Sequence, residues 1–175
     1  MTLQQKLLAK KSKKGFTLVE LVVVIAILAI LAAIAIPMVV NIINSATTSS
    51  GDSQAGELSR EAGSVYAGIK SGTINNDASK NADGTDVDFA APKSANAGEK
   101  KAAAQDCTIL EVKTYSGLNF DLGTEYWYCT HADANANIAV GDIKFSDTGA
   151  APAYDGADFE QLSDGTTLGE LYQEN

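Results

Sequence analysis

The apolar and polar positions of this 175-residue chain divide it into two unlike parts. Residues 21–40 (LVVVIAILAILAAIAIPMVV) carry no charged or strongly polar side chain. At 1.5 Å per residue, a helix of this length spans roughly 30 Å, which is about the hydrocarbon thickness of a bilayer. The pattern therefore predicts a membrane-spanning helix, because a core helix in a small domain would keep a polar face.

Beyond this run the chain has the mixed pattern of a packed domain. Four apolar positions recur at helical spacing: Leu58, Ala62, Val65 and Ile69. This spacing predicts an amphipathic helix that packs on a sheet, with Gly72 as its end signal. Residues 47–52 are rich in Thr, Ser and Gly, which are weak helix formers, and we expect a flexible neck there.

The remaining sequence has the signals of short strands and loops. Alternation and β-propensity predict strands at residues 108–114, 118–122, 125–130 and 138–145. Gly, Asn and Asp separate these segments, so the connections are short and the sheet is expected to be antiparallel. Residues 75–106 are expected to be mainly loop with a short helix near 98–105, and residues 146–175 a surface loop with an edge strand. The predicted fold class is α+β, with the second half of one long N-terminal helix packed on about four strands.

Charge is distributed as unevenly as hydrophobicity. The first 15 residues hold no acid and five bases: Lys6, Lys10, Lys11, Lys13 and Lys14. From residue 16 onward, 8 Lys and Arg (13 − 5) stand against 22 Asp and Glu, a formal charge of −14 (8 − 22). Such a body disfavours nucleic-acid binding. Lysines ahead of the apolar run place the N-terminus in the cytoplasm and the rest outside.

Glu20 is an unexpected residue at the start of an apolar segment. A carboxylate costs about 2.5–3.5 kcal/mol at the bilayer centre, and less near the edge, so it usually has a partner. A cut between Gly15 and Phe16 would create an α-amino cation that can pair with a carboxylate. The chain's own amine is sterically awkward for Glu20, which favours the Phe16 amine of a neighbouring subunit. Buried pairs of this kind are better at setting register than at adding stability.

Residues 13–20 (KKGFTLVE), followed by the apolar helix, resemble the class III signal of type IV pilins and type II secretion pseudopilins. The resemblance covers roughly residues 10–60. It implies cleavage by a prepilin peptidase after Gly15, methylation of the new N-terminal Phe16, and a role for Glu20 in subunit register. Many members of this family have a proline within the apolar helix, and Pro37 corresponds to it. A proline there bends or locally melts the helix, or it marks the exit from the membrane.

The resemblance implies three segments and a structural function. They are a leader at 1–15, a transmembrane and filament-core helix at 16–45, and a globular head at 46–175. We expect a homopolymer of a type IV pilus, built with the pilus assembly machinery. The subunit would lie in the cytoplasmic membrane before assembly and in an extracellular fibre afterwards. Two alternatives remain: a pseudopilin of a secretion or DNA-uptake machine, and an uncleaved membrane-anchored binding domain. A role in adhesion or motility stays open.

Two cysteines in a chain that looks exported favour a disulfide between Cys107 and Cys129. Such a bond would close a loop of about 20 residues and contribute about 3 kcal/mol to the free energy of unfolding. Two free buried thiols are the alternative. Trp127, two residues from Cys129, is expected to be a core residue.

The sequence offers little to an enzyme. His131, the one histidine, has no nucleophile elbow around it and is expected in an exposed turn. One His and two cysteines supply a metal site poorly, and there is no glycine-rich phosphate loop. The acidic segment 81–88 would need an acid at Ala90 to form a helix-loop-helix calcium site. We therefore expect no catalysis, metal or cofactor.

Overall fold

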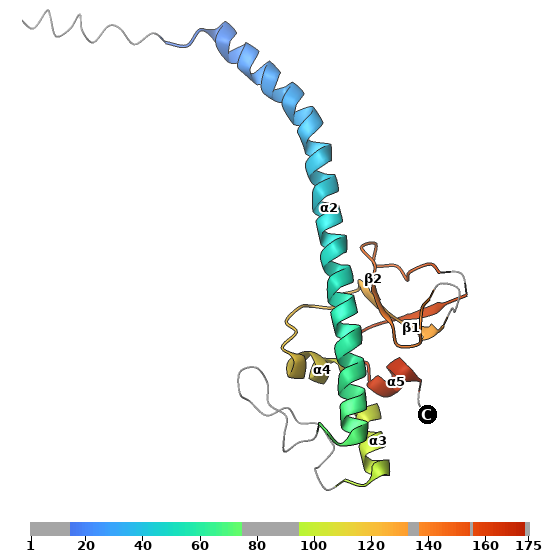
Figure 1. The fold of residues 1–175 in the computed structure, drawn as a ribbon. Helices are drawn as coiled ribbons and strands as arrows, with labels where there is room; N and C mark the ends of the chain where they lie inside the picture. Colours follow the sequence, from blue (N-terminus) through green and yellow to red (C-terminus); the bar gives the residue numbers. More distant parts are fainter. Residues whose placement is uncertain (1–14, 75–94, 133–136, 155, 174–175) are drawn as a thin grey trace, which may run out of the picture. The chain divides into compact units, whose positions relative to one another are not determined.

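The structure is a computed structural model that describes residues 15–74, 95–132, 137–154 and 156–173. Internal contacts divide the chain into two units, Met1–Ser45 and Ala46–Asn175. Helix α2 (Leu18–Ser71) has residues in both units. The second unit, called the head here, contains α2 from Ala46 onward and every other helix and strand of the described chain (Figure 1). These elements are α3 (Ala97–Asp106), α4 (Ile109–Ser116), β1 (Tyr126–His131), β2 (Ile143–Phe145), β3 (Asp158–Gln161) and α5 (Leu168–Tyr172).

The head part of α2 forms the centre of the hydrophobic core. The residues with predicted helical spacing, Leu58, Ala62, Val65 and Ile69, are all fully buried, which confirms the amphipathic helix. Its end is also confirmed, because α2 stops at Ser71 and Gly72 has a φ of +78°. Glycine adopts this left-handed backbone without the steric penalty of a Cβ atom.

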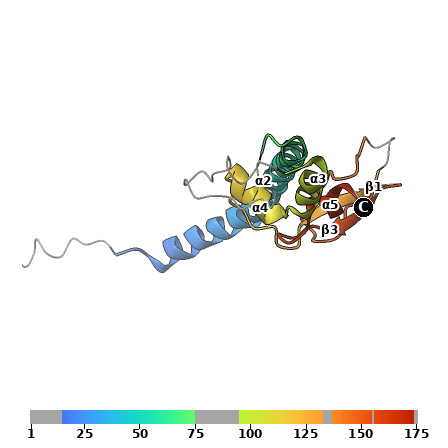
Figure 2. The same ribbon diagram turned by 90° about the horizontal axis from the view of Figure 1, so that it is seen from below.

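A three-stranded antiparallel sheet, in the order β2-β1-β3, packs against α2. The alternate residues Tyr126 and Tyr128 of β1 are buried in the same core as the helix, and the Tyr126 hydroxyl donates to the side chain of Gln54 on α2. In both views, α4 lies on one side of the head part of α2 and the sheet on the other (Figures 1 and 2). The α+β fold class is confirmed, with the second half of the helix on an antiparallel sheet.

The predicted strand at 108–114 is wrong, because this segment is helix α4. Thr108 and Glu111 form a capping box, in which each side chain binds the other residue's backbone N–H at the start of the helix. Ile109 and Val112, three residues apart, are fully buried. The β-branched residues of this segment favoured a strand. Its buried apolar residues are nevertheless spaced for one face of a helix.

Two other strand predictions are corrected as well. Residues 118–122 form no strand, although Leu122 is buried and Phe120 packs on the core. Of the segment 138–145, only Ile143–Phe145 is a strand. Gly141, with a φ of +87°, turns the chain just before it. The segment 125–130 is confirmed as β1, which makes the sheet three-stranded where about four strands were expected.

The predicted short helix near 98–105 is confirmed as α3, and the edge strand of the C-terminal region as β3. Helix α5 was not predicted. The segment before α5 pairs with the start of α4: the Ile109 amide donates to the Thr166 carbonyl and the Leu110 amide to the Asp164 carbonyl, both at 2.9 Å. These bonds attach the C-terminal segment to the core.

The predicted neck at 47–52 is helical throughout as part of α2. Gly51 is buried, and a Cβ atom at this position would overlap the ring of Phe145 on β2. The helix and the sheet therefore meet at a glycine because only a residue without a side chain lets the Phe145 ring come this close. Because Gly51 is packed in the head, it is not part of a flexible segment.

We expect Gly51→Ala to lower the free energy of unfolding by about 1–3 kcal/mol, because the added methyl group forces the Phe145 ring to move. Gly56 provides a matched control on the same helix, since a Cβ there meets nothing within 4 Å. Gly56→Ala should leave stability unchanged or raise it by up to about 1 kcal/mol. Denaturant unfolding of the full chain in detergent, followed by circular dichroism, measures both. Equal stabilities of the two variants would contradict the close contact.

Candidate functional site

The first candidate site lies at the start of α2. Gly15, Phe16 and Thr17 precede the helix in non-helical backbone, and all three are exposed. Thr17 and Glu20 form a capping box: the Thr17 amide and hydroxyl donate to Oε2 of Glu20 at 2.9 and 2.8 Å, and the Glu20 amide donates to the Thr17 hydroxyl at 3.2 Å. This box sets the first residue of the helix, so the Gly15–Phe16 peptide bond lies outside it.

The capping box uses one oxygen of the Glu20 carboxylate. Within the part of the chain that the structure describes, Oε1 of Glu20 accepts no hydrogen bond. A carboxylate has acceptor capacity on both oxygens, so a further donor can bind at Oε1. The positive end of the helix dipole favours a negative charge at this position.

Gly15 and Phe16 border a hollow of about 430 Å³ with Thr17 and Glu20. A Cβ atom on Gly15 would meet nothing within 4 Å. Packing inside the described chain therefore does not require a glycine here. A requirement for glycine would have to come from a molecule that binds this junction.

The helix that follows this junction presents apolar side chains on all sides. From Phe16 (87 % exposed) to Ile43, every large hydrophobic residue is about half exposed or more. The helix is long and apolar enough to cross a membrane, with a mean hydropathy of 3.1 in its most apolar 18-residue window. It continues through Pro37 without interruption. Proline has no N–H, so one intrahelical hydrogen bond is missing at Pro37, and the predicted local melting of the helix is not seen.

A family model for the prokaryotic N-terminal methylation motif matches residues 10–36. The matched segment contains Gly15, Phe16 and Glu20, and it is the class III signal peptide of type IV pilins and pseudopilins. The comparisons with curated proteins and with solved structures gave no match. The motif supports a type IV pilin-like or pseudopilin precursor, a structural subunit that a prepilin peptidase processes and an assembly machinery uses. The apolar helix fits membrane anchoring before assembly.

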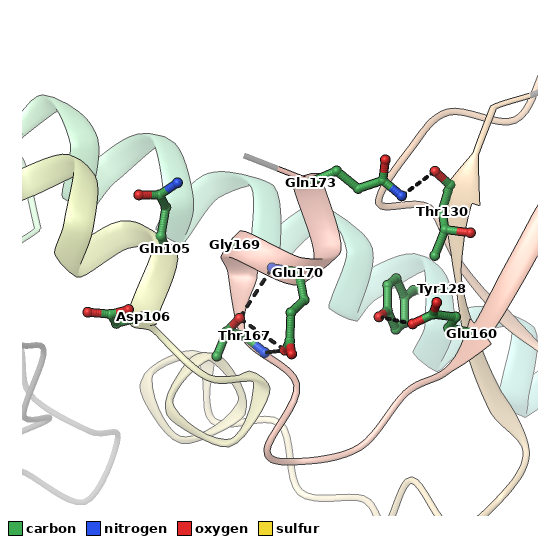
Figure 3. Close-up of a pocket in the computed structure, with 9 residues that line it drawn as sticks. All are labelled: Gln105, Asp106, Tyr128, Thr130, Glu160, Thr167, Gly169, Glu170 and Gln173. Carbon is green, nitrogen blue, oxygen red and sulfur yellow. Dashed lines mark hydrogen bonds between the residues drawn. The ribbon is translucent and has the colours of Figure 1, made fainter. Parts of the chain in front are cut away.

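A second candidate site is a polar pocket of about 580 Å³ in the head, between α3, β1, β3 and α5 (Figure 3). Three of its lining residues are acidic, and none is basic: Asp106, Glu160 and Glu170. Two of these carboxylates already serve the fold. The Tyr128 hydroxyl donates to Glu160 at 2.8 Å, and the Thr167 amide donates to Glu170 at 2.7 Å within the capping box of α5.

The acidic pocket also affects its tyrosine. Burial, followed by the bond to Glu160 and the charges of Glu160 and Glu170, raises the pKa of Tyr128, which stays a neutral donor. Among the described residues, no group of three or more His, Cys, Asp or Glu side chains could hold a metal ion. The possible calcium segment 81–88 lies outside the described residues. His131 is exposed at the end of β1 and not in a turn.

Both cysteines are free thiols in this structure, so the predicted disulfide is not confirmed. Cys107 follows α3, and Cys129 lies on β1, where its thiol donates to the His131 carbonyl at 3.1 Å. Burial, with a smaller effect of Glu111, raises the pKa of Cys107 to about 12, and burial also raises the pKa of Cys129. The neighbouring Trp127 is half buried, and its Nε1 is buried without a hydrogen-bond partner among the described residues.

Two polar interactions of the described chain were not predicted from the sequence. One is the bond between Thr17 and Glu20, although a Thr followed three residues later by Glu is the pattern of a capping box. The other is Lys113, which is 6 % exposed; its Nζ lies 2.8 Å from Oδ1 of Asp164 and over the Phe120 ring. No local pattern joins Lys113 to a residue 51 positions away.

We expect Cys107 and Cys129 to react slowly with iodoacetamide in the folded chain at pH 8, because only the thiolate is the nucleophile and both pKa values are raised. The rate should increase with pH and should rise by orders of magnitude in denaturant. Intact mass after labelling measures the number of groups added. Two labels in denaturant without reductant would support free thiols, and labels that appear only after reduction would show that the disulfide forms.

Proposed function

We propose that this chain is a subunit of a type IV pilus, anchored in the cytoplasmic membrane and then polymerised through α2 into an extracellular fibre. The observation that carries the proposal is the Glu20 carboxylate, which the chain's own Thr17 holds by one oxygen at the start of an exposed apolar helix. The match of residues 10–36 to the methylation motif supports it.

The first step would be hydrolysis of the Gly15–Phe16 peptide bond, which removes the basic leader. Its position outside the helix suits this reaction, because a peptidase needs access to the backbone groups of the bond that it cuts. Water adds to the Gly15 carbonyl carbon, and Phe16 leaves with a free α-amine. Methylation of this amine keeps its basicity, so the mature N-terminus remains a cation.

That cation would pair with Glu20 of a neighbouring subunit. The box with Thr17 leaves Oε1 of Glu20 available and holds the side chain at the helix start. Fixing the carboxylate before assembly reduces the conformational entropy lost in forming the pair. Because each Glu20 accepts one amine, the pair would set the axial register between subunits.

The apolar part of α2 would be buried in two successive environments, first the bilayer and then the fibre. Lipid tails surround its exposed Val, Ile and Leu side chains before assembly, and the same helices of other subunits surround them in the fibre. Transfer between two apolar environments changes the free energy of burial little, so assembly can depend on packing and on the Glu20 pair. Pro37 would then allow limited bending within the bundle.

A short fibre of a secretion or DNA-uptake machine is the second candidate, because pseudopilins carry the same motif. Electron microscopy of material sheared from cells distinguishes the two, since only a pilus yields long surface fibres. Intact mass separates both from an uncleaved anchored domain. A mature chain that lacks 15 residues and carries one added methyl group supports processing at Gly15.

We expect Gly15→Leu to block processing, although the chain itself has room for the new side chain. The full-length precursor should accumulate in the membrane fraction, visible by immunoblot and intact mass. Gly56→Ala is the control, because it also adds a side chain in open space but lies far along the chain from the junction. Normal shortening of the Gly15→Leu chain would contradict the proposed cleavage position.

We expect Glu20→Ala to be cleaved normally and to assemble at least about tenfold less well, because removal of one partner leaves the other charge of a buried pair uncompensated. The measurement is the fibre yield after shearing, normalised to mature subunit in the membrane. Glu57→Ala, an exposed glutamate farther along α2, serves as the control. A normal fibre yield from Glu20→Ala would overturn the register role.

A further inference from the structure

Helix α2 has a short segment, residues 46–50 (ATTSS), that the head hardly covers. Four of these five residues are exposed, and Thr48 is only partly buried. Residues 16–43 before it are the apolar segment, which lipid or other helices can surround. Gly51 after it is the first buried residue of the helix, held against Phe145. The segment therefore lies outside both of the environments that stabilise the rest of α2.

The side chains of this segment also favour a helix weakly. Four of its five residues are Thr or Ser, which have lower helix propensity than Ala. Hydroxyl groups of this kind compete with backbone N–H groups for helical carbonyls. This competition is present here, because the Ser53 hydroxyl donates to the Ser49 carbonyl at 2.8 Å. Such bonds slightly destabilise and bend helices.

A side-chain hydrogen bond at the surface connects the segment to the chain that follows β2. The Thr48 hydroxyl donates to Oδ2 of Asp147 at 3.2 Å, and both residues are at the surface. An exposed hydrogen bond of this length contributes little to stability, because water competes for both partners. Most helical stability in proteins comes from packing of an apolar face, and residues 46–50 have almost none.

We propose that residues 46–50 are a hinge, a place where α2 opens to non-helical backbone while the helix from Gly51 onward stays closed on the head. The opening depends only on residues 46–50 and their weak contacts with the head, and it does not depend on fibre formation. Its use rests on the function proposed above: a hinge there lets the head turn on the apolar helix as the subunit leaves the bilayer for a fibre. The proposed hinge overlaps the neck predicted at 47–52, but it lies within α2 and ends before Gly51.

Amide hydrogen exchange of the full chain in lipid bilayers tests the opening directly. The amides of residues 47–50 should exchange at least about 100-fold faster than those of Leu58, Val65 and Ile69, because local opening needs far less free energy than unfolding of the core. Protection of residues 47–50 equal to that of the packed half would overturn the hinge.

A set of variants tests the cause. Thr47→Ala, Ser49→Ala and Ser50→Ala together leave the Thr48–Asp147 bond in place and raise helix propensity, which should slow exchange at residues 46–50 about tenfold. The control combines Gly56→Ala and Ser64→Ala, two exposed positions in the packed half of the same helix, and should leave exchange at 46–50 unchanged. Fast exchange that the triple variant does not slow would contradict a hinge set by helix propensity.

Fibre assembly tests the use of the hinge. The triple variant should give at least about threefold fewer fibres than the control, with unchanged cleavage and membrane content, because a stiffened segment hinders turning of the head. Fibre yield equal to that of the control, together with slowed exchange, would overturn the role of the hinge in assembly. Absence of fibres from the unaltered chain would contradict the proposed function alone, since the exchange result does not depend on polymerisation.

Discussion

One constraint governs this chain: the residues that the structure describes leave the apolar surface of α2 from Leu18 to Ile43 exposed. Apolar surface in water is unfavourable by about 25 cal/mol for each Å² that burial would remove, so lipid or other protein must surround these side chains. An apolar environment around the helix is consistent with the charge distribution. Basic residues precede the helix, a carboxylate lies at its start, and an acidic head follows it. The methylation motif occupies the same stretch, residues 10–36.

The same capping box occurs at the start of several helices of the described chain, and its role depends on where the helix lies. Capping boxes begin three head helices, with Glu99, Glu111 and Glu170 as the reciprocal acids. Their role there is to satisfy the first backbone N–H groups of short helices. Glu20 forms the same box with Thr17, but at the edge of an apolar segment. Only Glu20 lies at the edge of an apolar segment, where the proposed pair with a neighbouring subunit would use its second carboxylate oxygen.

Sequence reasoning succeeded where the signal is local and failed where two signals compete. The short helix near 98–105, the strand at 125–130 and the buried face of α2 were all predicted, the last two from a β-prone run and from helical spacing. The segment 108–114 has β-branched residues that favour a strand, yet the Thr108 capping box and the buried pair of Ile109 and Val112 produce a helix. Propensity is a weak preference that packing overrides.

The sequence by itself determined the apolar segment and the place of Glu20 at its start, because hydropathy and consecutive motifs need no distant partner; the same motif predicts a cleavage junction at Gly15 and Phe16. Tertiary structure alone decided that Lys113 pairs with Asp164 and that Cys107 and Cys129 are both buried. It also decided that the head begins to hold α2 at Gly51, where the Phe145 ring lies on the backbone. Such contacts join residues about 50 to 100 positions apart, and no short stretch of sequence carries the information that pairs them.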